Sequence, residues 1–323
     1  MTPGNDPLPL RAIAKASDSE LDAAALKDLE WSLRQPRSLF SFSMSMLTGA
    51  ATIGALFPLF SVLYLLVQKG IAALHFSTFT ELPPAAMVEG GGFGNAIVGT
   101  VVIVAVATAI SIPFGVFAAV YITEFGPDTR TAAAVRFAAK VLTGLPSILA
   151  GVFAFAVVVL ATGGFSAPAA GVALALLMLP TILLTAEEAI KRVPPRMREA
   201  AVGMGATPTQ TVARVVLPTA LPGILTGIML AIARAAGETA PLLFTALFSD
   251  FWMSRTVPHF LPKTAGDLMK PTASLAVMIY NFSGSPFDNQ IAMAWSAALA
   301  LVVMVLLTNI LGQALAKRTS SIR

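Results

Sequence analysis

The chain has 323 residues, of which 56% are hydrophobic and only 12% are charged. A soluble domain usually carries about 25% charged residues, so this composition excludes an ordinary soluble protein and predicts one that lies in the bilayer. The chain has no cysteine, which excludes disulfides and thiolate metal sites, and its two histidines make a histidine metal site unexpected.

Residues 1–38 are predicted to form a polar N-terminal segment ahead of the first apolar run. Ser17 and Glu20 have the spacing of a capping box, and three leucines follow at helical spacing. We expect an amphipathic helix that packs on the membrane surface or on a partner subunit. The next apolar run exceeds the roughly 7–15 residues of a signal-peptide core, so a cleaved signal peptide is not expected.

Six stretches are apolar enough to cross the membrane as helices, each of which needs roughly 20 residues. The runs are continuous rather than alternating, which favours helices over the strands of a membrane barrel. We therefore predict an all-α membrane protein with six transmembrane helices, whose membrane domain covers residues 39–316 and whose tail covers residues 317–323. The predicted spans are Leu39–Val67, Ala96–Ile122, Ala138–Ala161, Ala167–Ala186, Pro218–Phe248 and Ile291–Ala316.

The placement of Lys and Arg predicts the orientation of these spans. The N-terminal segment, the second and fourth loops and the tail together hold 16 basic residues, whereas the other loops hold 4. Basic residues concentrate on the cytoplasmic side of membrane proteins, so both termini and these two loops are predicted to be cytoplasmic. The formal net charge of +4 then reflects topology, and a nucleic-acid partner is not expected.

The fourth loop, residues 188–217, has the composition of a compact helical element. A short helix is predicted over Arg196–Met204, ended by Gly205, because glycine adopts the left-handed conformation that often follows a helix. A second helix is predicted to begin near Thr207, with Pro208 at its first position. A basic loop that only sets topology and a DNA-reading helix-turn-helix are the alternatives, and a position between two spans argues against the second.

A basic residue, Arg234, lies inside the predicted fifth span, where a charge is costly and indicates a functional site by default. Glu238 follows four residues later, on the same face of a continuous helix. The two groups could neutralise each other or pair with a second subunit, or Arg234 could offer its forked donors to an oxyanion. Thr239 follows directly and is included in the predicted substrate pathway.

The fifth loop, residues 249–290, is long, rich in proline and predicted to be external. It contains a moderately apolar patch, Leu275–Tyr280. Loops of this length usually have a function or a structure of their own. A gate, a docking surface for an external protein and a passive cap all remain open.

The fourth loop also has six residues at a fixed spacing, namely Glu199, Ala200, Ala201, Gly205, Leu217 and Pro218. This pattern resembles the EAA motif of ABC importer permeases. The resemblance implies the type I importer permease fold and a coupling helix that docks in a groove of a cytoplasmic ATPase. The chain has no Walker A sequence, so ATP and Mg²⁺ would be bound by separate ATPase subunits, and this chain would have neither a cofactor nor a catalytic site of its own.

Further stretches resemble the A-type permease of the bacterial phosphate-specific (Pst) importer. They are GGFGNAIVGT (91–100), FGVFAAVYITEFGP (114–127), GLPSILAGVFAF (144–155), ARAAGETAPLLFTA (233–246) and SPFDNQIAMAW (285–295). The resemblance implies a multi-pass inner-membrane subunit that moves inorganic phosphate by alternating access. Its implied partners are a second homologous permease, two ATPase subunits, an external phosphate-binding protein and membrane lipid.

The chain departs from the family pattern at Leu184, where family members often have an arginine within Arg-Thr-Thr-Glu-Glu. If that arginine helps to pass phosphate, Arg234 or a partner subunit would carry more of the role here. A permease for another oxyanion, such as sulfate or molybdate, is the alternative within the class. A secondary transporter is the alternative outside it, and its expected sign would be more ionisable residues within the spans.

Overall fold

The computed structural model describes residues 36–253 and 264–321, which form helices and no strands. The predicted N-terminal capping box and amphipathic helix lie outside these described residues. The chain divides into two compact units, residues 1–64 and 65–323. The long helix α2, Pro36–Ala72, begins in the first unit and ends in the second.

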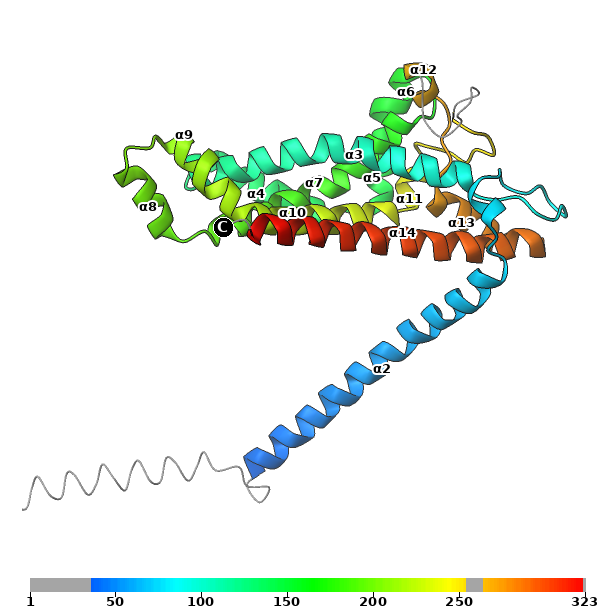
Figure 1. The fold of residues 1–323 in the computed structure, drawn as a ribbon, viewed down its shortest axis with the longest axis horizontal. Helices are drawn as coiled ribbons and strands as arrows, with labels where there is room; N and C mark the ends of the chain where they lie inside the picture. The colour runs from blue at the N-terminus through cyan, green and yellow to red at the C-terminus, as the bar shows by residue number, and fades with distance from the viewer. Residues whose placement is uncertain (1–35, 254–263, 322–323) are drawn as a thin grey trace, which may run out of the picture. The chain divides into compact units, whose positions relative to one another are not determined.

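The second unit is a bundle in which four long helices run side by side (Figure 1). They are α3 (Gly94–Val120), α7 (Ala167–Lys191), α10 (Leu217–Ala236) and α14 (Asp288–Ser321). Together with α2, five helices within the described residues are long and apolar enough to cross a membrane, and a bent helix pair makes a sixth candidate. The predicted all-α fold with six spans is confirmed in this sense.

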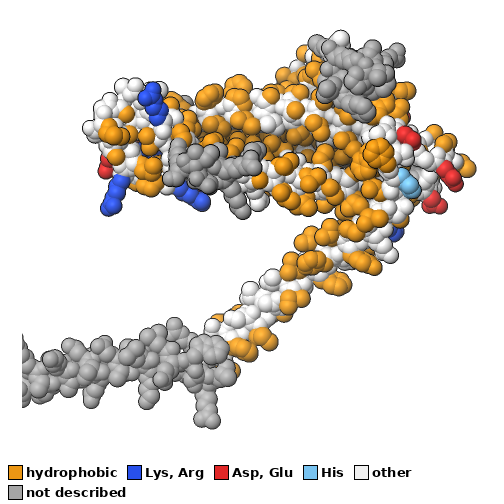
Figure 2. Space-filling view, viewed as in Figure 1, with side chains coloured by type: hydrophobic (Ala, Val, Ile, Leu, Met, Phe, Trp, Pro, Cys, Tyr) orange, Lys and Arg blue, Asp and Glu red, His pale blue; other side chains and the backbone are white. Residues whose placement is uncertain are grey.

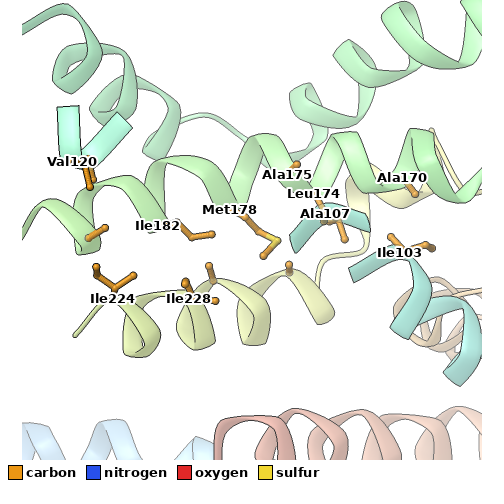
Figure 3. Packing of buried hydrophobic residues seen from close by; sticks show 14 of the residues in the cluster. Ile103, Ala107, Val120, Ala170, Leu174, Ala175, Met178, Ile182, Ile224 and Ile228 are labelled. Atoms are coloured by element: carbon orange, nitrogen blue, oxygen red, sulfur yellow. The ribbon is translucent and has the colours of Figure 1, made fainter. Parts of the chain in front are cut away.

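The core of the bundle lies where α7 packs between α3 and α10 (Figure 3). Met178 and Ile182 of α7 are buried and are directed toward Ile228 of α10. Small residues bring the backbones close, because a Cβ on Gly115 of α3 would lie 2.8 Å from the Cγ2 of Ile182. Close approach of small residues is the usual basis of helix packing in membranes, where hydrophobic burial supplies no driving force.

The predicted third span, Ala138–Ala161, is broken into two helical segments. Helix α4, Arg130–Thr143, ends at a short break, and the chain turns by 107° into the segment Ser147–Thr162. Pro146 explains the turn, since it has no N–H to donate and disfavours helical backbone at the residue before it. The segment after the break consists of α5 (Ser147–Ala154), a π-helical turn (Phe155–Val159) and α6 (Leu160–Thr162).

The limits of the predicted fifth span, Pro218–Phe248, are wrong. The candidate span covers Pro208–Ala236, because α9 and a π-helical turn lead directly into α10. The π turn immediately before Pro218 shifts the hydrogen-bond register, which accommodates a residue without an N–H. At the other end, Gly237 caps α10 and a short helix, α11, follows at Ala240–Leu243.

The predicted external loop folds against the bundle in its described part. Helix α13, Leu275–Ser283, is capped by Ser274 and packs on α3 and α14. The Oγ1 atom of Thr100 in α3 accepts a hydrogen bond from the backbone N–H of Leu275 at 2.9 Å. Leu275, Met278 and Phe282 of α13 join a buried cluster with Phe93, so the apolar patch is packed except at Tyr280, which is exposed.

Candidate functional site

The fourth loop, residues 188–217, contains two helices joined by a tight turn, as predicted. Helix α8, Pro195–Gly203, is followed by Gly205 with φ +86°. The N–H of Gly205 donates to the carbonyl of Val202 at 2.8 Å, and the N–H of Ala206 donates to the carbonyl of Ala201 at 3.1 Å. These two bonds form a Schellman motif, which satisfies carbonyls at the helix end and needs a left-handed residue at the Gly205 position.

The second helix of the loop, α9 (Pro208–Thr211), begins with a capping box. The hydroxyl of Thr207 accepts a hydrogen bond from the N–H of Gln210, and the Gln210 side chain accepts one from the N–H of Thr207. Pro208 takes the first helical position, where a missing N–H costs no helical bond. Reciprocal capping holds the turn between α8 and α9 in a defined geometry.

The six motif residues are divided between two sides of this loop. Glu199 and Ala200 are exposed on α8, whereas Ala201 is buried. Leu217 and Pro218 are half-buried at the start of α10, directly after the π turn Val212–Val216. One side of α8 is thus free to meet another protein while the other packs on its own subunit.

An arginine next to the motif joins α8 to the rest of the subunit. Arg198 donates to Glu124 through Nη2 at 2.7 Å to Oε1 and through Nε at 3.3 Å to Oε2. Its guanidinium also donates to the carbonyls of Ile190 and Val193 at the C-terminal end of α7. The Arg198 and Glu124 side chains are 25% and 11% exposed, so water screens this pair only partly.

A second arginine binds the same region. Arg136 of α4 donates through Nε to the Oε1 atom of Glu187 at 2.7 Å, and Lys191 lies 2.8 Å from that oxygen. Arg136 also donates to the carbonyls of Ile122 at 2.6 Å and of Pro127 at 3.0 Å. The Glu187 side chain is buried, and its two cations offset the cost of burying its charge.

These two ion-pair groups were absent from the predicted site. Arg136 and Arg198 were counted only as markers of topology, although they bind carboxylates far away in the chain. The sequence separation is 51 residues for Arg136 and Glu187, and 74 residues for Arg198 and Glu124. The sequence does place two carboxylates, Glu124 and Glu187, beside predicted cytoplasmic ends of spans. Their position alone does not indicate which basic residues they bind.

The predicted pathway residues lie where α10 ends. The Nε atom of Arg234 is 3.5 Å from the Oε1 atom of Glu238, so the predicted pair forms. Glu238 follows the Gly237 cap rather than continuing the helix, and its N–H donates to the carbonyl of Ala235. The Arg234 side chain is 54% exposed, whereas that of Glu238 is 17% exposed. Thr239 follows Glu238, half-buried, at the start of α11.

Leu184 lines a groove of about 570 Å³ between α7 and α10. The groove also contains Thr185, Glu188, Arg192 and Thr226 among its polar side chains. The departure from the family arginine therefore falls on a surface open to solvent or to a partner, and not in the buried core.

Comparison with known proteins defines the class. Residues 111–321 match the family described as binding-protein-dependent transport system inner membrane component. The fold is similar to that of a bacterial alginate ABC transporter chain, with a TM-score of 0.59, 14% identity, and coverage of 89% of this chain and 98% of the other. It is also similar to a chain of the MetNI methionine ABC transporter, with a TM-score of 0.54, 22% identity, and coverage of 71% and 94%. The protein has the type I ABC importer permease fold.

Closer relatives define the particular family. The phosphate transport system permease protein PstA of Yersinia pestis is 37% identical over 297 residues, which cover 92% of this chain and 95% of the relative. The PstA protein of Haemophilus influenzae is 38% identical over 264 residues, covering 82% and 89%. PstA 1 of Mycobacterium tuberculosis is 36% identical over 261 residues, covering 79% and 80% of the two chains. The chain belongs to the PstA family of phosphate transport permeases.

Proposed function

We propose that this chain is the membrane-spanning permease subunit of an ATP-driven inorganic phosphate importer. The observation that carries the proposal is its similarity to PstA proteins along almost the whole chain. The fold adds independent support for the transporter class, because its solved neighbours are ABC importer permeases.

In this proposal α8 is the coupling helix. The exposed Glu199 and Ala200 would face an ATPase subunit, and the buried Ala201 would hold α8 on its own subunit. Closure of an ATPase dimer that binds ATP and Mg²⁺ would move two such loops and reorient the spans by alternating access. That mechanism needs a loop that docks differently in two global states and transmits the difference.

The distribution of charge supports an orientation with α8 in the cytoplasm. Lys and Arg side chains gather mainly at the end of the second unit that holds α8, and the visible acidic side chains lie mainly at the other end (Figure 2). This asymmetry is typical of a multi-pass inner-membrane protein whose basic side faces the cytoplasm. We infer that both termini are cytoplasmic and that α13 is on the external side, toward a phosphate-binding protein.

Arg234 is the residue that we expect to meet phosphate. Its side chain is exposed on this subunit, so the pathway would be completed by a second homologous permease. The 3.5 Å separation from Glu238 is a loose ion pair, which leaves donors available to an oxyanion. Glu238 would then hold Arg234 when phosphate is absent.

The test uses a complex of this chain with its second permease, the ATPase subunits and the binding protein, reconstituted in proteoliposomes. We expect Arg234→Ala to lower ATP-driven phosphate uptake by about 100-fold, as loss of a charge-assisted contact in a desolvated pathway implies. Arg130→Ala, at the exposed start of α4, is the matched control and should transport normally. Undiminished uptake by Arg234→Ala would refute its role, and equal inhibition by excess sulfate or molybdate would favour another oxyanion.

A further inference from the structure

Arg198 connects its own helix, α8, to two other elements of the subunit through one guanidinium. It belongs to α8, its carboxylate partner Glu124 belongs to the π-helical turn Tyr121–Phe125, and its two carbonyl partners end α7. The π turn is the direct continuation of α3. One planar side chain therefore connects the proposed docking helix to both helices that form the centre of the bundle.

The contacts of Arg198 suit a rigid connection. Two guanidinium nitrogens donate to the two carboxylate oxygens of Glu124. This bidentate pairing fixes the orientation of the two side chains as well as the distance between them. Its remaining contacts are with the carbonyls of Ile190, in the last turn of α7, and of Val193, two residues beyond it, where the helix dipole is negative. Half-burial of the group keeps these interactions stronger than those of an exposed pair.

Arg198 links α8 to elements outside its own loop. Apart from chain connectivity, the elements packed closest to α8 are α9 and the π turn Val212–Val216, which belong to the same loop. Arg136 binds the same π turn, because it donates to the carbonyl of Ile122, and it lines the same pocket as Arg198. A displacement of α8 would thus be transferred to a turn that both arginines bind.

We propose that Arg198 is a positioning residue that transmits movement of α8 into α3 and α7 through Glu124, an inference that rests on the proposed function. The docking surface for the ATPase is the exposed face of α8, whereas Arg198 points inward. Without the Arg198–Glu124 connection, the ATPase would still dock and hydrolyse ATP. Hydrolysis would no longer be coupled to movement of the spans.

The variants Arg198→Gln and Glu124→Gln break the connection from its two ends. Each should keep ATP hydrolysis within about twofold of wild type and lower the phosphate transported per ATP by about tenfold or more, as loss of charge-assisted bonds implies. The double variant should be no worse than Arg198→Gln alone, since Arg198→Gln already removes the interaction with Glu124. Arg198→Lys keeps the charge without the fork and should give an intermediate ratio.

The matched control is Arg130→Gln, which removes the same charge from an exposed position with no ion-pair partner among the described residues. Three results would overturn the proposal: a transport-to-hydrolysis ratio like that of the control, additive losses in the double variant, or failure of the ATPase to co-purify with Glu124→Gln. Glu124 lies outside α8, so its variants report on transmission even if Arg198→Gln does not fold. If the wild-type complex itself shows no ATP-driven phosphate uptake, the proposed function is refuted rather than the role of Arg198.

Discussion

Gly205 offers the sharpest test of the proposed coupling loop, residues 188–217. The space around it would accommodate a larger side chain, but its backbone conformation would not. A Cβ built on Gly205 would meet no atom within 4 Å, so substitution creates no clash. Its φ of +86°, however, lies in the left-handed region, which costs a residue with a Cβ about 1–2 kcal/mol. That cost would lower the population of the Schellman turn by a factor of about 5–30.

A nearby glycine provides the control for this prediction. Gly203 also has open space around its Cβ position, but it lies within α8 and has no left-handed φ. Gly203→Ala should therefore be neutral or stabilising, because alanine favours helix by about 1 kcal/mol over glycine. Gly205→Ala should loosen the turn, and Gly205→Asn should be milder, since asparagine tolerates the left-handed region better.

The assay is phosphate transported per ATP hydrolysed in proteoliposomes that contain the assembled complex. We expect Gly205→Ala to lower this ratio severalfold, Gly205→Val to lower it further, and Gly203→Ala to leave it unchanged. Equal ratios for Gly205→Ala and Gly203→Ala would show that the left-handed turn has no part in coupling, and the reasoning from φ would be refuted.

Two further predictions concern stability, measured as thermal unfolding of the purified subunit in detergent. Gly227→Ala should destabilise the bundle by about 1–3 kcal/mol, because its Cβ would overlap the Oγ1 atom of Thr185, whereas Gly164→Ala, which meets open space, should not. Glu187→Ala should cost about 1.5–3 kcal/mol by leaving Arg136 without its carboxylate, and Lys191→Ala should cost under about 1 kcal/mol, because the Lys191 side chain is 47% exposed. A Gly164→Ala variant as unstable as Gly227→Ala, or equal losses for Glu187→Ala and Lys191→Ala, would contradict these assignments.

The features that could be predicted from sequence are those fixed by local chemistry. Gly205 and Thr207 were identified as a helix end and a helix start because left-handed backbone and capping depend on neighbouring residues only. The long apolar runs predicted helices for the same reason. The Arg234–Glu238 pair was also predictable, since the two residues are four positions apart.

The features that could not be predicted depend on hydrogen-bond register or on distant partners. Pro218 was taken as the start of a span because the preceding π turn has no sequence signature, and the 107° size of the bend at Pro146 depends on packing rather than on the proline alone. The Arg198–Glu124 pair joins residues 74 positions apart, so only the packing of α3 against α7 brings them together.

The most direct test of the proposed function is uptake of labelled phosphate by proteoliposomes that contain this chain with its second permease, ATPase subunits and binding protein. We predict uptake that requires ATP and that an excess of sulfate or molybdate leaves unchanged. Uptake without ATP, or displacement of labelled phosphate by either of these oxyanions, would contradict the account.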